Sequence, residues 1–541
     1  MNAGALIPQP FDDGAHAGQG SAKFATLVAV CVSTFMLPLD YTIVSVALHD
    51  IQIDLKASFI DIQWIVNAYT LTFAAFLLAG GAFSDLFGRR RIFLGGLSVF
   101  MLSSLACGLA PFAVLLNIAR GVQGVGAAFM FASAVPLLVR EFEGPERARA
   151  FGIFGAIVGI GAALGPFLGG LIVGALGWRW AFLVNVPVTA FVIGLTLWRV
   201  RDSRDPNAGG LDWGGFITFS AACFLLVLAL ILGNDAGWSS QRIIGLFAGV
   251  VVLLLVFASV ETRRIYPMFD LSLFKSATFI GASLPPLVLS ISFWGPFLYF
   301  PLYYQGVLGY SPLAAGAAVL PFAVPLFVMG PVGGWLAARI PSRALLALGQ
   351  GLVGAGALLL LWRTSAGSTW TAFVLGGLVC GTGAGLINGE MTNVAVSIVP
   401  EERSGMASGI NGTMRQVGVA LGFAGLGAIL ARRTADAFGA VADTLGVPAD
   451  QIKVLASRIV KGDIHGAVAS VPVPLQQGFE AAAGASMFEG MRSIALVAGV
   501  VGLGGAVLTF LLMRPFTVTE PGADDITAGD AAGEWPAHKP R

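Results

Sequence analysis

The sequence predicts an all-α integral membrane protein with about fourteen transmembrane helices. Of its 541 residues, 56% are hydrophobic and only 11% are charged, whereas about a quarter of the residues in a soluble domain are charged. The apolar residues come in blocks of roughly 20, which as helices cross a hydrocarbon layer about 30 Å thick. A formal net charge of +1 gives no basic surface for a nucleic acid, so the expected partner is the lipid bilayer.

Charged or Pro/Gly-rich breaks separate the predicted helices. In chain order the predicted spans are Phe24–Ala47, Ile60–Gly80, Ile92–Ala110, Ala113–Val139, Phe151–Leu171, Trp180–Trp198, Trp213–Leu232, Ile243–Val260, Ala277–Tyr304, Pro312–Leu336, Ala344–Trp362, Thr369–Ile398, Met406–Leu430 and Ile494–Met513. The polar start of the chain lacks the short apolar core of a signal peptide. We therefore expect residues 1–23 to be a cytoplasmic tail and the first span to be retained.

The distribution of Lys and Arg predicts the orientation of these spans. With the N-terminus inside, the short outer loops keep only Lys56, Arg179, Arg242 and Arg363, and the other loop arginines face the cytoplasm, as short cytoplasmic loops require. Both termini are then cytoplasmic. The outer segment 431–493 is too polar to span and is expected to form short surface helices, and the tail 514–541 has the composition of a disordered segment.

An internal repeat divides the spans into two halves. The segment Gly334–Gly349 aligns with the loop after the second span, matching Gly81 with Gly334 and Arg90 with Arg343. We therefore expect an N-terminal six-helix bundle over residues 24–199, a C-terminal one over 277–513, and two inserted helices over 213–260. Repeated halves around a central site are typical of secondary transporters that work by alternating access.

Four short motifs carry a family resemblance. "GGAFSDLFGRRR" (Gly80–Arg91) resembles the loop motif between the second and third helices of the major facilitator superfamily, and "IARGVQGVGAA" (Ile118–Ala128) resembles its fourth-helix motif. "GIGAALGPFLGG" (Gly159–Gly170) is similar to the fifth-helix motif of its antiporters, and "LDYTIVSVAL" (Leu39–Leu48) points to the drug:proton antiporters with fourteen spans. His49 departs from the first-helix motif, which usually has proline there. The resemblance implies two six-helix bundles of the major facilitator type plus two inserted helices.

The energy source is expected to be a proton gradient, with no cofactor. No Gly-rich loop ending in Gly-Lys-Ser/Thr is present to bind a nucleotide. Asp40 and Glu390 are the carboxylates well inside the predicted spans, and each would cost roughly 3 kcal/mol if ionised at mid-membrane. They are therefore candidates for proton coupling, together with Arg120, which lies at the same depth as Asp40, ~10 Å below the outer surface.

Each of these assignments has a structural alternative. Asp40 and Arg120 could form a fixed ion pair that holds two helices together. Glu390 could be a second proton site or an acid that only packs helices. Arg415 is a further charge within the membrane and a candidate partner of Glu390.

Candidate substrate contacts lie on the ninth span. Its aromatic residues Phe293, Trp294 and Phe297 suit flat amphipathic cations through cation–π attraction and apolar burial. The alternative is an aromatic belt at the membrane interface. Arg415 is the polar candidate. The resemblance places spans one, four, nine and twelve around the transport cavity.

The loop after the second span is a candidate cytoplasmic gate. Gly81 and Gly88 would permit a tight turn, Asp85 would cap a neighbouring helix end, and Arg89 and Arg90 would face the cytoplasm. By resemblance, this cluster is a latch that closes the cytoplasmic side in the outward-open state.

The fifth span carries a candidate hinge. Gly161, Gly165 and Gly169 allow close backbone approach, and Pro166 removes a backbone donor and bends the helix. The same residues would also suit a tight seam between the two halves.

The combined prediction is a monomeric proton-coupled exporter of amphipathic, cationic drugs or toxic compounds in a bacterial cytoplasmic (inner) membrane. The alternative is a dedicated exporter of an endogenous metabolite or lipid, including an anionic one, with Arg120 and Arg415 as contacts. A membrane enzyme or a non-transporting receptor is a third class, which the sequence does not favour because it lacks a Ser/His/Asp set and metal-ligand spacing. The four cysteines lie within apolar blocks, so no metal is expected.

Overall fold

The chain forms two packed bundles of long helices in a computed structural model. The structure describes residues 13–515 apart from 58, 203–211, 264–270, 298, 311, 400–403, 443–446, 448 and 461–463. Residues 1–12 of the predicted N-terminal tail, and the tail predicted to be disordered from 516 onward, lie outside the described residues.

The N-terminal bundle contains seven helical segments within its described residues. They are α1 (Asp13–Asp54), α2 (Phe59–Phe87), α3 (Arg89–Gly108), α4 (Ala113–Glu141), α5 (Gly144–Leu176), α6 (Trp180–Leu183) and α7 (Asn185–Arg199). The inserted pair is α8 (Trp213–Ala236) and α9 (Gln241–Glu261). Asp212 and Ser240 cap this pair, because their side chains accept hydrogen bonds from the backbone N–H groups of Gly215 and Ile243.

The C-terminal bundle is more broken. Its first crossing consists of the 3-10 turn η1 (Leu271–Lys275), α10 (Ala277–Leu289), the π-helical turn η2 (Ser290–Trp294), α11 (Gly295–Phe297) and α12 (Tyr299–Gly306). It continues with α13 (Pro312–Ala318), α14 (Leu320–Ala337), α15 (Ser342–Arg363), α16 (Trp370–Asn388), α17 (Glu390–Ser397), α18 (Ser404–Ala442), α19 (Ala449–Val460), α20 (Ile464–Ala469) and α21 (Val473–Leu512).

The predicted spans fall on these helices. Among the described residues, twelve helices are long and apolar enough to cross a membrane, and a thirteenth candidate is α2, which bends by 50° between Leu77 and Ala79. The remaining predicted span falls on α5, a helix of 33 residues whose side chains are only partly described. Exposed apolar side chains, such as Val252 and Leu255 on α9, supply a surface suited to lipid.

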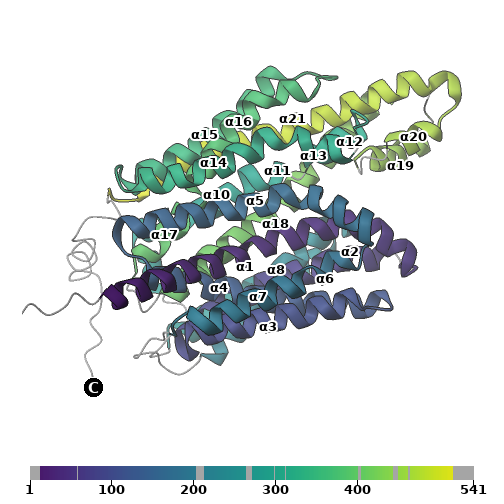
Figure 1. The fold of residues 1–541 in the computed structure, drawn as a ribbon. Coiled ribbons are helices and arrows are strands. Elements are labelled where there is room, and N and C mark those ends of the chain that lie inside the picture. The colour runs from purple at the N-terminus through teal and green to yellow at the C-terminus, as the bar shows by residue number, and fades with distance from the viewer. Residues whose placement is uncertain are drawn as a thin grey trace, which may run out of the picture.

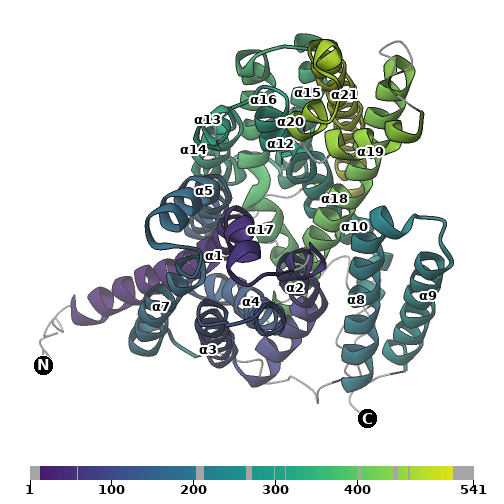
Figure 2. The same ribbon diagram turned by 90° about the vertical axis from the view of Figure 1, so that its right-hand side faces the viewer.

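The two bundles lie side by side, with the inserted pair at their edge (Figures 1 and 2). Helix α5 packs on α14, α16 and α17, and α18 packs on α2 and α4, so these helices form the seam between the halves. Helices α18 and α21 are 39 and 40 residues long, or roughly 60 Å each. The outer segment predicted to hold short helices therefore contains α19 and α20, but also the continuation of these two long helices.

Candidate functional site

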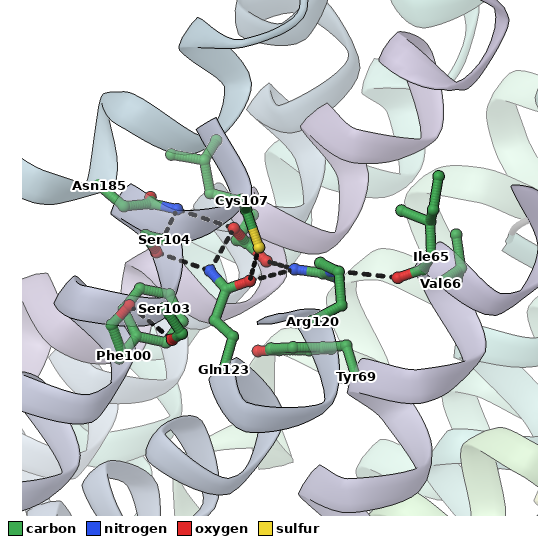
Figure 3. A network of polar contacts seen from close by, with 12 residues as sticks. Ile65, Val66, Tyr69, Phe100, Ser103, Ser104, Cys107, Arg120, Gln123 and Asn185 are labelled. Atoms are coloured by element: carbon green, nitrogen blue, oxygen red, sulfur yellow. Dashed lines mark hydrogen bonds and ion pairs between the residues drawn. The ribbon is translucent and has the colours of Figure 1, made fainter. Parts of the chain in front are cut away.

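The two intramembrane charges of the first and fourth spans form a buried ion pair. Nη1 of Arg120 lies 2.6 Å from Oδ2 of Asp40, and neither side chain is exposed. Gln123 and Asn185 donate hydrogen bonds of 3.1 and 2.7 Å to Oδ1 of Asp40. Gln123 also donates to Ser104, so α1, α3, α4 and α7 meet in one polar network (Figure 3). The carboxylate of Asp40 thus accepts hydrogen bonds from three side chains.

Arg120 is held on two further sides. Its Nε donates to the backbone carbonyl of Ile65 at 2.9 Å, and its guanidinium lies 4.2 Å from the centre of the Tyr69 ring. Figure 3 shows Tyr69 beside Arg120, and Ile65 on the side of Arg120 opposite Gln123. The cation therefore has both a carboxylate and an aromatic face as partners, which offsets its removal from water.

Sequence reasoning missed Gln123 and Asn185. Both are almost fully buried, and both lie within predicted spans, in the fourth-helix motif and near the start of the sixth span. A buried amide requires hydrogen-bond partners, so polar residues inside apolar blocks were the available signal.

Glu390 lies in a separate polar site near the seam. It is only 2% exposed, its Oε1 accepts a hydrogen bond from Ser342 at 3.3 Å, and its Oε2 accepts one from Asn393 at 3.1 Å. It begins α17 after a break in the twelfth span at Gly389. Glu390 thus belongs to the C-terminal bundle and does not contact the Asp40 network.

Arg415 does not pair with Glu390, contrary to one expectation. Within the described part of the chain, no ion pair joins Arg415 to a carboxylate. Its Nη1 donates instead to Oδ1 of Asn388 at 3.4 Å, and Nδ2 of Asn388 donates to the backbone carbonyl of Gly155 at 2.8 Å. Because Gly155 is on α5, this chain of contacts crosses the seam between the halves.

Glycines allow backbones to touch along the same seam. A Cβ on Gly155 would lie 2.8 Å from Cα of Gly389, and one on Gly152 would lie 2.8 Å from the carbonyl oxygen of Gly330. These distances are shorter than an ordinary contact of about 3.5–4.0 Å. The helices can therefore pack in this arrangement only with glycine at these positions.

The predicted cytoplasmic gate links the two halves. Oδ2 of Asp85 accepts a hydrogen bond of 3.1 Å from the backbone N–H of Met406, in the first turn of α18. Arg89 lies 3.7 Å from Asp85 and donates to Oγ of Ser404 at 2.9 Å. A carboxylate at a helix N-terminus is stabilised by the unpaired N–H groups there. Both contacts connect the N-terminal bundle to α18.

The glycines of this gate have different roles from those predicted. Gly81 lies inside α2 and is buried, so it forms no turn. Gly88 alone makes the turn, with a φ of 101° that residues other than glycine rarely adopt. Arg90 donates to the carbonyls of Thr196 and Leu197 near the end of α7, so it binds its own bundle and not the opposite one.

The predicted hinge residues lie against α1. A Cβ on Gly161 would lie 2.6 Å from the carbonyl oxygen of Phe35, and one on Gly165 would clash with the side chain of Thr42. Gly169 is buried. These residues form a seam within the N-terminal bundle, whereas Gly152 and Gly155 form the one between the halves. The side chains of Pro166 and His49 lie outside the described residues.

The aromatic residues of the ninth span cluster inside the C-terminal bundle. Phe293 is 3% exposed, its ring centre lies 5.2 Å from that of Trp294 and 5.7 Å from that of Phe297, and Phe297 contacts Phe322. Trp294 and Phe297 are partly exposed. Tyr303, on the same crossing, is fully buried in the same core. In this conformation Phe293 is a core residue, and Trp294 and Phe297 are the accessible members.

Among the described residues, no group of three His, Cys, Asp or Glu side chains could hold a metal ion. The four cysteines are free and buried, as expected for small core residues.

Comparison with known proteins matches this architecture. The family model described as the Major Facilitator Superfamily matches residues 30–423. The chain is 40% identical over 411 residues to the multidrug resistance protein Stp of Mycobacterium tuberculosis, covering 76% of both chains. It is 36% identical over 431 residues to the tetracenomycin C resistance and export protein of Streptomyces glaucescens, covering 78% of both. The multidrug transporter protein MdtP of Bacillus subtilis is 27% identical over 538 residues, covering 96% of this chain and 99% of the relative.

A solved structure shares the fold. The proton:xylose symporter XylE aligns with a TM-score of 0.60 over 94% of this chain and 99% of its own, at 12% identity. At that identity the likeness concerns the arrangement of the helices only.

Proposed function

The chain belongs to the major facilitator superfamily, a family of membrane transporters, and from that premise we propose that it exports drug-like amphipathic compounds in exchange for protons. Relatives of similar length are named for multidrug resistance and for antibiotic export. We place it in a bacterial cytoplasmic membrane as a monomer with both termini in the cytoplasm. Cationic amphipathic compounds are the expected substrates, with Trp294 and Phe297 as their aromatic contacts and Arg415 as a polar one.

The observation that carries the proposal is the buried Asp40–Arg120 pair. A charged pair removed from water costs several kcal/mol per ion unless partners compensate, and such residues inside a membrane mark ion pathways by default. Protonation of Asp40 would remove the charge that holds Arg120 at 2.6 Å and loosen the contacts of Gln123 and Asn185. The proton would thereby change how α1 packs on α4 and α7.

Competition of the substrate and the proton for the charge of Asp40 then couples their movements. A cationic substrate that approaches α1 favours ionised Asp40, so it expels the proton, and a returning proton expels the substrate. Glu390, buried beside the seam, is the second candidate for proton binding. Its neighbours Ser342 and Asn393 are neutral, so they can serve either protonation state of the carboxyl group.

The driving force is sufficient for export. A membrane potential of 100 mV contributes roughly 2.3 kcal/mol per charge, and one pH unit contributes about 1.4 kcal/mol. Their sum of about 3.7 kcal/mol per proton sustains a substrate gradient of several hundredfold.

Reconstituted protein tests the proposal directly. Proteoliposomes with an imposed pH gradient and an internal pH dye receive ethidium, and wild type is compared with Asp40→Asn. We expect ethidium to trigger proton movement in wild type and little in Asp40→Asn. The matched control is Asp54→Asn, because Asp54 lies on the same helix at the exposed outer end, and it should leave the coupling intact.

Two other outcomes would change the assignment of the coupling site or refute proton exchange. Proton movement that survives in Asp40→Asn and stops in Glu390→Gln would move the coupling site to Glu390. Ethidium transport without any proton movement in wild type would refute proton exchange.

A further inference from the structure

Two nitrogen donors of the Arg415 guanidinium form no hydrogen bond within the described residues. Among the described residues, its Nε and Nη2 have no hydrogen-bond partner, although both atoms are shielded from solvent. Buried polar atoms are almost always hydrogen-bonded, and leaving a charged donor unpaired is costly. The unpaired edge therefore requires a functional explanation.

The two free atoms are on one edge of the guanidinium. Its Nε–H and the N–H of Nη2 on the same side point in parallel, and this is the edge that binds a carboxylate through two hydrogen bonds. The third nitrogen, Nη1, is the one bound to Asn388 at 3.4 Å. The contact that orients Arg415 thus leaves its two-donor edge free.

The surroundings hold this edge in place. Asn388 is fixed by its own hydrogen bond of 2.8 Å to the carbonyl of Gly155. One turn before Arg415, Asn411 donates to the carbonyl of Met391 at 3.1 Å, which ties α18 to α17. The guanidinium therefore does not need to be ordered when a ligand arrives, which reduces the entropic cost of binding.

Glu390, the partner for Arg415 that the sequence suggested, is already engaged. Both oxygens of Glu390 accept hydrogen bonds from Ser342 and Asn393, and no described carboxylate forms an ion pair with Arg415. The position also suits a transported compound, because Arg415 lies on a seam helix and reaches towards α5 of the other half through Asn388. A ligand bound to Arg415 would therefore lie against a helix of the seam.

We infer that the free edge of Arg415 binds a carboxylate group carried by the transported compound. This inference rests on the proposed function and narrows it, since it requires substrates that combine an apolar body with a carboxylate, whether or not they also carry a cation. The Arg415–Asn388–Gly155 contacts would then let a bound carboxylate stabilise the seam in its closed form.

A matched pair of probes tests the inference on the purified full-length protein in detergent. The probes are 1-naphthoate and methyl 1-naphthoate, which share an apolar body and differ in the carboxylate, and binding is measured by calorimetry. We expect Arg415→Lys, which keeps the charge but loses the two-donor edge, to weaken naphthoate binding about tenfold, because one charge-assisted hydrogen bond is lost. Binding of the ester should not change.

Two further variants make the test decisive. Arg432→Lys alters an exposed arginine on the same helix and should leave both affinities as in wild type. Asn388→Ala removes the oxygen that orients Arg415 and leaves the guanidinium, so it should also weaken naphthoate binding selectively. This variant replaces Arg415→Lys in the test if Arg415→Lys does not fold.

The result that overturns the inference is equal binding of naphthoate and its ester to wild type, or an equal loss of both in Arg415→Lys. Ethidium-driven proton movement by wild type would persist in that case, so the proposed function would stand. If ethidium moves no protons while Arg415→Lys selectively weakens naphthoate binding, the carboxylate site stands and proton exchange fails.

Discussion

The close backbone contact at Gly389 predicts how a single methyl group shifts the conformational equilibrium. A Cβ at this position would lie 2.7 Å from the carbonyl carbon of Phe151 and closer still to its oxygen. Gly389 has a φ of −81° and a ψ of −40°, which alanine adopts without strain. The whole effect of Gly389→Ala therefore comes from the collision between α5 and the junction of α16 and α17.

The size of the effect follows from that distance. To bring the carbonyl carbon alone to an ordinary contact of about 3.5 Å, the two backbones must separate by roughly 0.8 Å, and the closer oxygen requires more; neither backbone can yield by changing a rotamer. Overpacking of this kind costs typically about 1–3 kcal/mol. At 1.4 kcal/mol per factor of ten, the ratio of seam-closed to seam-open protein should fall by about fivefold to 150-fold.

Spin labels report the separation of the two halves. Labels on cysteines introduced at positions 149 and 339, which are exposed near the start of α5 and the end of α14, give a distance distribution by double electron–electron resonance. We expect Gly389→Ala to populate longer distances than wild type. Gly174→Ala is the matched control, because a Cβ at Gly174 on α5 meets no atom within 4 Å. An unchanged distribution in Gly389→Ala, with the protein folded, would refute the steric account of the seam.

Two further predictions concern the ends of the bundles. Asp85→Asn should slow transport at normal abundance, because the carboxylate bound to the N–H of Met406 loses its charge at the N-terminus of α18; normal turnover at normal abundance would contradict the latch. At the C-terminal end of α1, hydrogen bonds from Arg179 and Trp178 hold the pKa of Asp54 below its usual value. A carboxyl group whose pKa is lower in the folded than in the unfolded protein stabilises the fold at pH values above the unfolded pKa. This stabilisation is lost as the pH falls through the folded pKa. Asp54→Asn should therefore lower the Tm more at pH 7 than near pH 3, and an equal deficit at both pH values would exclude this linkage.

Much of the fold could be predicted because membrane insertion depends on local composition. Each apolar block of about 20 residues is a helix for the same reason wherever it lies in the chain, since backbone polar groups must be satisfied inside the segment. The predicted spans accordingly fall on helices, including the bent α2 and the broken first crossing of the C-terminal bundle. The meeting of Asp40 and Arg120 was also predictable from their matching depth.

The partners of these charges could not be predicted in the same way. Whether Arg415 meets Glu390 or Asn388 depends on the rotation of α16, α17 and α18 about their axes, and hydropathy along the chain carries little information on rotation. The assignment of Gly81 to a turn failed for a related reason, because α2 continues through it to Phe87. The assignment of Gly88 to the turn was correct, and its φ of 101° lies outside the helical range.

The sequence by itself determined that this protein is a multi-helix membrane transporter, because burial in lipid constrains every span locally and the motifs mark its family. The tertiary structure decided which polar groups share a site. It joined Gln123 and Asn185 to the Asp40 pair, separated Glu390 from Arg415, and placed Gly155 against Gly389. These contacts connect residues far apart in the chain, so they depend on how the helices pack against one another and not on the composition of any one of them.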